Sequence, residues 1–363
     1  PFKHQEDVLK ISWNQSVWAY FMEMGTGKSK VCIDNVGILF EKNEIDTFVV
    51  IAPKGVYRNW SNIEIPMHLP DHIEKEICVW RPSPNKKEKE LLLSLLKEKV
   101  PGVLRIFVMN VEALSTAKGT SYLAALLKKS VTLLAIDEST AIKNPKAKRT
   151  KTIIKISRGA KYKRILTGSP VTQSPLDLWA QCNFLSPTLL GETGDNFFQY
   201  QYRFAIMKKT TVGANSFNMV VGYKNLDKLN ELLKNFSSRI MKEECLDLPD
   251  KVYITRSVQL TEDQERIYSE IKNFALAQIN DEEFMTAPNI MTQLVRLQQV
   301  LSGHTKTDEG NTIEIKDNRL PELINCIDDM SGKVIIWSRF RYDIKRIYDT
   351  LTKTYGFRST VTY

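Results

Sequence analysis

The sequence has few cysteines and no long apolar run. Its five cysteines form no Cys-x-x-Cys pair, which argues against a disulfide framework and against a structural zinc site. No apolar stretch reaches the length of a membrane span, and the first residues, PFKHQEDVLK, lack the apolar core of a signal peptide. We therefore expect a cytoplasmic or otherwise intracellular protein with no membrane contact.

Negative charge is also in short supply. The chain has 51 Lys and Arg residues against 42 Asp and Glu residues, a formal net charge of +9. An acidic partner is expected from this balance, and nucleic acid is the commonest one. A basic surface kept for solubility would give the same charge. The length of 363 residues suggests two domains.

Short apolar runs alternate with amphipathic stretches in the first part of the chain. The runs predict buried strands at 17–21, 47–52, 105–110, 131–136 and 163–167. Helical spacing lies between them, at 29–41, 86–98, 121–129, 146–157 and 175–184. Alternation of nearly continuous apolar strands with helices predicts an α/β fold whose parallel sheet is covered on both faces.

A second β/α pattern begins near Val252. It predicts strands at 252–260 and 333–338 and the start of another at 358–363, with helices at about 262–280, 288–301, 319–330 and 340–354. The polar stretch 302–318 is expected to be a loop. The region between the two patterns is less regular, and Pro249 in LPDK suits a boundary because proline disfavours a continuing helix.

The stretch MEMGTGKS contains the second half of a phosphate-binding loop, with Met22 where the full pattern has its first glycine. A predicted strand precedes it and a predicted helix follows, as the motif requires. Backbone N–H groups of such a loop and of the helix N-terminus form an anion cradle. Gly25 and Gly27 permit close approach of the backbone, Lys28 can reach the β- and γ-phosphates, and the Ser29 hydroxyl can bind magnesium.

The stretch LLAIDEST is an apolar run that ends in two adjacent carboxylates. Ligands bind at the ends of the strands in α/β sheets. Asp137 is expected to hold magnesium through water, and Glu138 to orient or deprotonate the attacking water. Either motif alone could be an ordinary turn, but the two together indicate hydrolysis of a nucleoside triphosphate. Upstream of the loop, Gln5 could read an adenine edge with its amide.

Taken in order, these stretches resemble the Swi/Snf-like family of superfamily-two helicase-type DNA-dependent ATPases, over nearly the whole chain. PFKHQ is similar to the family's adenine-reading segment, and the family's motif I, like MEMGTGKS, dispenses with the first glycine. Further similarities follow in order: VVIAPKGVYRNW with motif Ia, RIFVMNVEAL with motif Ib, DESTAIKN with motif II, ILTGSPVTQSPLDLWAQCNFLSP with motif III and its extension, and KVIIWSRFRYDIKRI with motif IV.

The resemblance implies two RecA-like lobes that bind ATP and magnesium in the cleft between them. Lobe 1 would cover 1–236, a junction 237–251, and the N-terminal part of lobe 2 252–363. The implied catalytic residues are Lys28, Asp137 and Glu138, and the implied magnesium ligands are Ser29 and Asp137. ATP-binding residues would be Gln5, Met24, Gly25, Thr26, Gly27, Lys28 and Ser29.

Other residues are implied to couple ATP to nucleic acid. Thr167, Gly168 and Ser169 would pass the state of the γ-phosphate to the neighbouring lobe. Nucleic-acid contacts are expected from Pro53, Lys54, Asn110 and Arg339. A basic stretch without acidic residues between Ala141 and Pro170 could add phosphate contacts, although at least half of its cations are expected only to solvate a helix.

The expected function is a nucleic-acid-stimulated ATPase motor that translocates on double-stranded DNA as its two lobes open and close. Two alternatives stay open: a strand-separating DNA or RNA helicase, and a nucleic-acid-binding scaffold with little ATP turnover. Thr140 departs from the family, which often has histidine there, and motifs V and VI have no match. The chain alone is therefore expected to bind ATP but hydrolyse it poorly, and the natural protein is expected to continue. The absence of long insertions favours a bacterial or viral source.

Overall fold

The computed structural model describes residues 1–97, 100–191, 194–212, 215–280, 287–307 and 310–356. The chain divides into two compact units, Pro1–Pro249 and Asp250–Tyr363. We refer to them as unit 1 and unit 2 and describe each by itself. All five cysteines are free thiols, as the sequence predicted.

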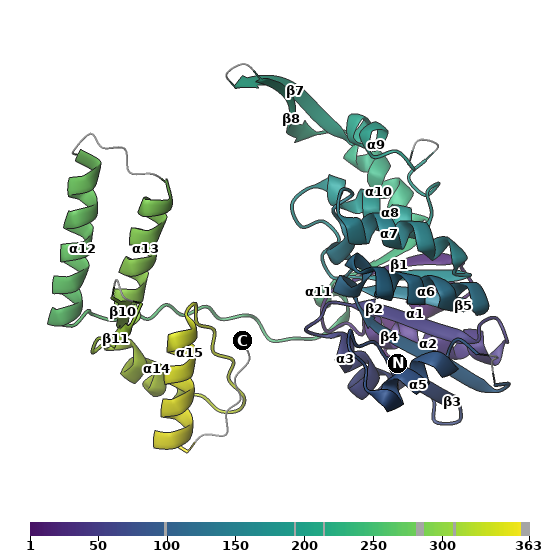
Figure 1. Cartoon of the computed structure of the whole chain (residues 1–363), viewed down its shortest axis with the longest axis horizontal. Helices are drawn as coiled ribbons and strands as arrows, with labels where there is room; N and C mark the ends of the chain where they lie inside the picture. The colour runs from purple at the N-terminus through teal and green to yellow at the C-terminus, as the bar shows by residue number, and fades with distance from the viewer. Residues whose placement is uncertain (98–99, 192–193, 213–214, 281–286, 308–309, 357–363) are drawn as a thin grey trace. The chain divides into compact units, whose positions relative to one another are not determined.

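Unit 1 is built on one parallel sheet of seven strands in the order β3-β4-β2-β5-β6-β1-β9 (Figure 1). All pairings between neighbours in this sheet are parallel. The carboxyl ends of the strands therefore lie along a single edge. The strands are β1 Val17–Met22, β2 Thr47–Ala52, β3 Glu74–Val79, β4 Val103–Asn110, β5 Thr132–Asp137, β6 Tyr162–Leu166 and β9 Ser237–Ile240.

Both faces of this sheet are buried, which explains the nearly continuous apolar strands. Along β5, Leu134 and Ile136 belong to one core cluster, whereas Leu133 and Ala135 belong to the other. The first core packs against α5 Lys86–Ser94, α6 Ala117–Lys129, α7 Lys148–Ile156 and α8 Leu178–Leu185. The second packs against α1 Lys3–Ser12, α2 Lys28–Glu41, α3 Tyr57–Asn59 and α4 Ile65–His68. The predicted α/β fold class is confirmed.

Five strands and five helices of unit 1 lie where the sequence predicted them, and the two other strands of the seven-stranded sheet, β3 and β9, were missed. β3 is the edge strand of the sheet, and its sequence EKEICV carries charges because one side of the strand has no neighbour. β9 is only four residues long and reads SSRI, which gives no apolar run. Both strands are held by pairing with a longer neighbour, which a pattern within one segment does not show.

The region 186–236, expected to be irregular, instead contains regular elements. They are α9 Phe197–Phe204, the antiparallel strands β7 Ala205–Val212 and β8 Asn215–Tyr223, and α10 Leu226–Lys234. The short helix α11 Lys242–Cys245 follows β9. In Figure 1 the β7–β8 hairpin extends away from the helices of unit 1. The hairpin strands AIMKKTTV and NSFNMVVGY mix polar and apolar residues rather than forming a continuous apolar run, so no buried strand was predicted there.

Unit 2 contains the four predicted helices: α12 Glu262–Asn280, α13 Ala287–Leu301, α14 Arg319–Asp328 and α15 Arg341–Asp349, the last continued by a π-helical turn Thr350–Thr354. The predicted loop 302–318 was wrong in part, because it contains a small hairpin formed by β10 His304–Lys306 and β11 Thr312–Glu314. The predicted strand at 358–363 lies outside the described residues.

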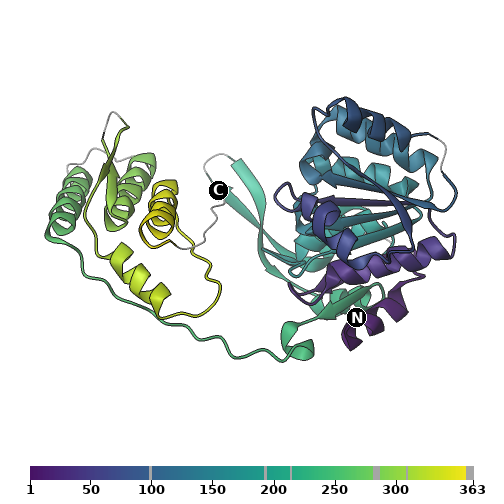
Figure 2. The same cartoon turned by 90° about the horizontal axis from the view of Figure 1, so that it is seen from below.

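The predicted strands at 252–260 and 333–338 are wrong. Both segments are extended but form no ladder within the described part of the chain, and Figure 2 shows the first of them as a plain trace before α12. A strand requires a neighbour for its backbone N–H and C=O groups. Apolar side chains are consequently exposed on both segments, among them Tyr253 and Trp337. The apolar pattern was present, but the pairing it needs was not.

Candidate nucleotide and nucleic-acid site

The phosphate-binding loop connects β1 to α2 at the carboxyl edge of the sheet. Gly25 and Gly27 adopt φ angles of +85° and +89°, a region that only glycine enters without strain. A Cβ atom at Gly27 would also lie 2.1 Å from Nε2 of Gln5. At Gly27 the backbone is therefore left-handed, and the Gln5 side chain lies too close to it for any other residue to fit. Lys28 and Ser29 open α2 directly after it, so that the helix N-terminus faces the loop.

Met22 takes the place of the first motif glycine because the strand continues through it. It is the last residue of β1 and its side chain is fully buried in the core. The turn begins only at Glu23, whose carbonyl accepts the Thr26 hydroxyl at 2.7 Å. The Thr26 side chain thus points inward, while Met24 is 65% exposed at the outside of the loop.

The N-terminal segment packs against this loop. The Gln5 amide donates to the Thr26 carbonyl at 3.1 Å and its oxygen accepts the Phe2 backbone N–H at 3.0 Å. His4 Nε2 lies 2.8 Å from the same Thr26 carbonyl. Gln5 therefore supports the loop, and its reading of an adenine edge stays a prediction. His4 was missed by the sequence reasoning, although it stands beside Gln5.

Asp137 is the last residue of β5, and its carboxylate is almost fully buried. The indole N–H of Trp60 donates to its Oδ2 at 2.9 Å, and the Glu138 backbone N–H donates to its Oδ1 at 3.0 Å. Burial raises the pKa of Asp137, whereas the bond from Trp60 and the charge of Lys28 oppose that rise. The carboxylate is therefore held by two donors in a setting that disfavours its charge.

Trp60 is buried, and its ring is in edge contact with Phe48 at 6.2 Å between centroids. It opens a short π-helix, Trp60–Glu64. Its bond to Asp137 was missed, because the two residues are 77 positions apart in the sequence. Only the sheet order, which places β2 beside β5, brings them together.

Glu138 turns the chain at the carboxyl edge with a positive φ of 47°, unusual for a residue other than glycine. Its Oε1 lies 3.7 Å from the Lys28 ammonium nitrogen, and its Oε2 accepts the Thr167 hydroxyl at 3.4 Å. The three predicted catalytic residues, Lys28, Asp137 and Glu138, therefore gather beside the glycine loop. Strain at a turn of this kind is often found at functional sites.

The segment Thr167–Gly168–Ser169 follows β6, between the carboxylates and the phosphate-binding loop. The Thr167 hydroxyl accepts the Ser169 backbone N–H at 3.2 Å while it donates to Glu138. A Cβ atom at Gly168 would lie 3.2 Å from the Met24 backbone nitrogen. The segment thus contacts Glu138 on one side and the phosphate-binding loop on the other. This position is compatible with the predicted coupling role, which stays a prediction.

Lys242 also reaches the loop. Its backbone N–H donates to the Glu23 carboxylate at 2.9 Å, and its side-chain Cε would lie 3.5 Å from a Cβ at Gly25. No role at the nucleotide was predicted for this residue from the sequence. The pairing of β9 with β1 brings it to the phosphate-binding loop instead.

The predicted nucleic-acid residues of unit 1 lie together on the same edge. Ala52 and Asn110 are register partners on β2 and β4, so Pro53, Lys54 and Asn110 are neighbours. Lys54 is exposed, whereas the Asn110 amide donates to the Glu112 carboxylate at 2.9 Å. Arg339 belongs to unit 2, where its guanidinium lies 5.8 Å from the centre of the Phe340 ring.

Several cations of the basic stretch have structural partners, and the expectation that at least half of its cations only solvate a helix stays a prediction. Lys161 pairs with Glu44 at 2.6 Å, and Lys143 contacts Thr172 and Asp177. Arg164 is fully buried and bonds to Asn35 and to the carbonyls of Ser12 and Gln15. Fewer cations of this stretch are therefore available to a polyanion than the sequence suggests.

A parallel α/β sheet with a glycine loop, a lysine and two carboxylates at one edge defines a P-loop nucleotide site of the helicase type. The family model described as "SNF2-related domain" matches residues 19–305. The chain belongs to this family, which confirms the Swi/Snf-like resemblance. Relatives in this family are named ATPases and ATP-dependent helicases.

Relatives support this assignment. The chain is similar to "Chromatin-remodeling ATPase INO80" of Eremothecium gossypii, with 28% identity over 253 residues that cover 69% of the chain and 17% of that protein. It is also similar to "Uncharacterized ATP-dependent helicase" of Mycoplasma pneumoniae, with 24% identity over 329 residues that cover 90% of the chain and 28% of that protein. The chain thus spans less than a third of the length of either relative.

Among solved structures, the chain is similar to "Sulfolobus solfataricus SWI2/SNF2 ATPase core in complex with dsDNA". The TM-score is 0.51 at 22% identity, with coverage of 98% of this chain and 69% of that one. This likeness supports the fold. In the part of the chain that the structure describes, no helix is long and apolar enough to cross a membrane.

Replacing Trp60 by phenylalanine should destabilise unit 1 in a pH-dependent way. The change removes the indole donor, so the already raised pKa of Asp137 should rise further. The loss should be about 1.5–3 kcal/mol where Asp137 is ionised in the folded protein, and should shrink as the pH falls and Asp137 takes up its proton. Urea unfolding over a pH series measures the free energy of unfolding.

Trp18→Phe is a matched control, because the Trp18 indole donates to the neutral Ser238 hydroxyl at 3.0 Å. Its loss should be about 0.5–1.5 kcal/mol at every pH. A Trp60→Phe loss that is equally flat with pH would show that the indole does not stabilise the Asp137 charge.

Proposed function

We propose that this chain is the ATPase core of a nucleic-acid-stimulated motor that translocates on double-stranded DNA. The observation that carries the proposal is the convergence of Lys28, Asp137 and Glu138 beside the glycine loop in a chain of the SNF2-related domain family. Two named relatives are an ATPase and an ATP-dependent helicase, and the similar solved core was determined with double-stranded DNA.

ATP is the proposed substrate, with its phosphates on the loop from Met24 to Ser29. The left-handed glycines turn backbone N–H groups toward the anion, and Lys28 adds a charge that follows the phosphates. Ser29 and Asp137 would hold magnesium, through water in the case of Asp137. Magnesium typically keeps several waters and takes one or two carboxylates, which fits the single buried carboxylate here. When bound, the ion would neutralise charge on the β- and γ-phosphates.

Glu138 is the proposed group that orients the attacking water and accepts its proton. Its carboxylate lies 3.7 Å from the Lys28 ammonium nitrogen. A phosphate that engages Lys28 would release Glu138 from this pair, so that its carboxylate is available to water. The Thr167 hydroxyl on its other oxygen then reports the position of Glu138 to the segment that follows β6.

The proposed lobes are 1–236 and 252–363, joined by 237–251. Unit 1 would be the first RecA-like lobe and unit 2 the N-terminal part of the second. Opening and closing of these lobes during the ATP cycle would move the chain along a nucleic-acid backbone. Pro53, Lys54 and Asn110 would contact that backbone from unit 1, and Arg339 from unit 2. Strand separation stays the alternative outcome of the same chemistry.

Lys28→Ala should abolish nucleic-acid-stimulated ATP hydrolysis, because the lysine is the cation aimed at the phosphates. ATP turnover of the full chain, and of any longer native form, is measured without nucleic acid and then with duplex DNA, single-stranded DNA and RNA. Strongest stimulation by duplex DNA is expected. Lys30→Ala is the matched control: it removes a lysine from the same helix that pairs with Asp34 at 2.8 Å. If no nucleic acid stimulates turnover, the motor proposal fails.

Glu138→Gln should keep ATP binding and lose hydrolysis. The amide retains the shape of the side chain but cannot take a proton from water, and loss of a general base lowers rates by about 10²–10⁴-fold. Binding is measured with a fluorescent ATP analogue, and turnover by phosphate release. Near-normal turnover in this variant would remove Glu138 from the proposed mechanism.

Lys54→Ala should weaken duplex DNA binding and lower the salt dependence of binding. If Lys54 meets one phosphate, the slope of log affinity against log salt falls by about 0.9. Lys87→Ala is the control, because Lys87 is equally exposed but lies on α5, which covers one face of the sheet, rather than at its carboxyl edge. Equal slopes for the two variants would place Lys54 outside the DNA contact.

A further inference from the structure

The β7–β8 hairpin and the helix before it carry positive charge and exposed aromatic rings. From Asn196 to Leu226 the sequence has four basic residues and no Asp or Glu: Arg203, Lys208, Lys209 and Lys224. Phe198 and Tyr202 on α9 are 73% and 76% exposed. The Lys224 ammonium nitrogen lies 4.9 Å from the centre of the Tyr202 ring. A segment of this composition suits a polyanion that also has flat apolar groups.

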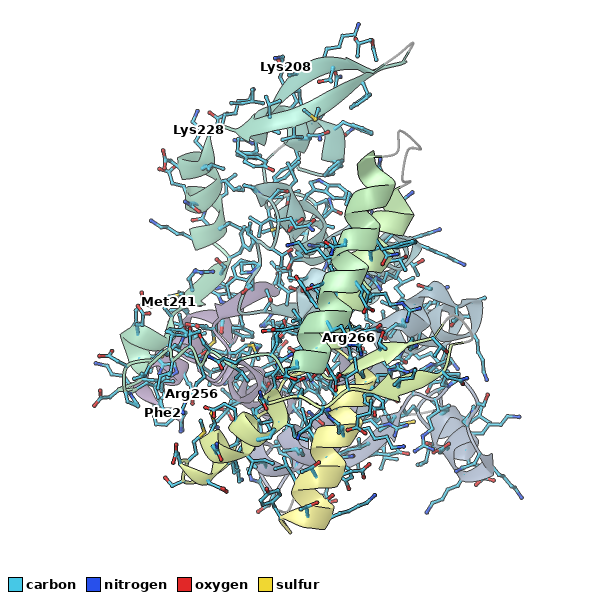
Figure 3. The ribbon with its side chains drawn as sticks, turned by 90° about the vertical axis from the view of Figure 1, so that its left-hand side faces the viewer. Phe2, Lys208, Lys228, Met241, Arg256 and Arg266 are labelled. Atoms are coloured by element: carbon cyan, nitrogen blue, oxygen red, sulfur yellow. The ribbon has the colours of Figure 1, made fainter. Side chains whose placement is uncertain are left out.

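The hairpin itself has one face that combines both features. Lys208 is the register partner of Met219, and Thr210 is the partner of Phe217. Cross-strand partners share a face of a ribbon, so these four side chains lie together. Phe217 and Met219 are 48% and 47% exposed. We name the set Lys208, Thr210, Phe217 and Met219 the aromatic face of the hairpin; Lys208 is labelled on the hairpin in Figure 3.

The opposite face has no ring in this stretch. Lys209 is the partner of Asn218, and Thr211 is the partner of Ser216, with their hydroxyl oxygens 3.0 Å apart, while Met207 and Val220 form the next pair on that face. Both faces therefore offer one lysine from the middle of β7, but only the aromatic face places an aromatic ring near it. The two faces of the hairpin therefore differ, and only the aromatic face is suited to stacking on a base.

Folding alone does not account for this arrangement. A two-stranded ribbon is marginally stable by itself, and nearly half of the Phe217 and Met219 surface is left in water. An exposed apolar patch on an element that extends from the body is typical of a contact surface. The positive charge of the segment favours an acidic partner, and the exposed Phe217 ring favours a partner with flat rings on which it can stack. Single-stranded nucleic acid has both.

We propose that the aromatic face of the β7–β8 hairpin is an accessory contact for an unpaired nucleic-acid strand, with Lys208 on a phosphate and Phe217 stacked on a base. In a duplex the base faces are covered by their neighbours, so Phe217 would reach them only in a single strand or at a duplex end. The inference rests on the proposed nucleic-acid-stimulated function and adds where an unpaired strand would be held.

The test compares two double variants of the full chain. Lys208→Ala/Phe217→Ala changes the aromatic face, and Lys209→Ala/Asn218→Ala changes the opposite face at an adjacent register position. Each removes one positive charge from β7. Binding of labelled oligothymidine and of a blunt DNA duplex is measured by fluorescence anisotropy over a salt series, with circular dichroism and ATP binding as controls for folding.

The aromatic-face variant should bind oligothymidine about tenfold more weakly, with a salt slope lower by about 0.7. Its loss on the blunt duplex should be much smaller, and the opposite-face variant should lose little on either. Phe217→Trp should retain binding and Phe217→Leu should not, because only the first keeps a stacking ring. Equal losses from the two faces, or on the two nucleic acids, would overturn the proposal.

The wild-type chain separates this inference from the proposed function. If nucleic acid stimulates its ATP hydrolysis and the aromatic-face variant binds oligothymidine normally, only the hairpin contact is overturned. If wild type responds to no nucleic acid, the motor proposal fails and the hairpin contact falls with it. A protein partner for the aromatic face would give the first of these results.

Discussion

The site depends on the parallel order of four strands, β2-β5-β6-β1, because parallel strands end at one edge. The turns after these strands supply, in that order, Lys54, the carboxylates Asp137 and Glu138, the Thr167 segment and the phosphate-binding loop. None of these groups is close to the next in the sequence. A single antiparallel strand among the four would send its turn to the opposite edge and break the set. Ligand chemistry is thus a consequence of strand direction, which the helical crossovers between the strands set.

Among the residues at this edge of the sheet, Asp137 is the one whose burial costs free energy, because its carboxylate is removed from water. Burial disfavours the ionised carboxylate, yet the proposed magnesium site would need that form. Two hydrogen-bond donors, the Trp60 indole and the Glu138 backbone, stabilise the ionised carboxylate, as does the nearby charge of Lys28. The arrangement holds the carboxylate in place without cancelling its charge, as a direct ion pair would. A bound cation would then relieve the remaining desolvation, so that metal binding and stability are linked at this residue.

The sequence predicted those parts of the fold that carry their own pattern. β1, β2, β4, β5 and β6 are buried on both faces and read as apolar runs, and the glycine loop and the Asp137–Glu138 pair read as motifs. What it did not predict depends on neighbours. β3 and β9 are strands because of the partner beside them, whereas 252–260 and 333–338 have the apolar pattern but no partner. The contacts of Trp60 and Lys242 likewise follow from strand order. Arg164 belongs to a stretch that the sequence suggested as basic surface, but it is buried and its hydrogen bonds connect β6 to α1 and α2.

The pairing of β9 with β1 has a mechanical meaning for the proposed motor. β1 runs into the phosphate-binding loop, and β9 runs into α11 and the chain that leads to unit 2. Glu23 joins them twice: its backbone N–H donates to the Ile240 carbonyl at 2.9 Å, and its carboxylate accepts the Lys242 N–H at 2.9 Å. In the proposed motor, a shift of the loop on ATP binding would therefore act on the junction through Glu23, by one bond from its backbone N–H and one to its carboxylate. The nucleotide would then be sensed at the start of the chain segment that connects the two units.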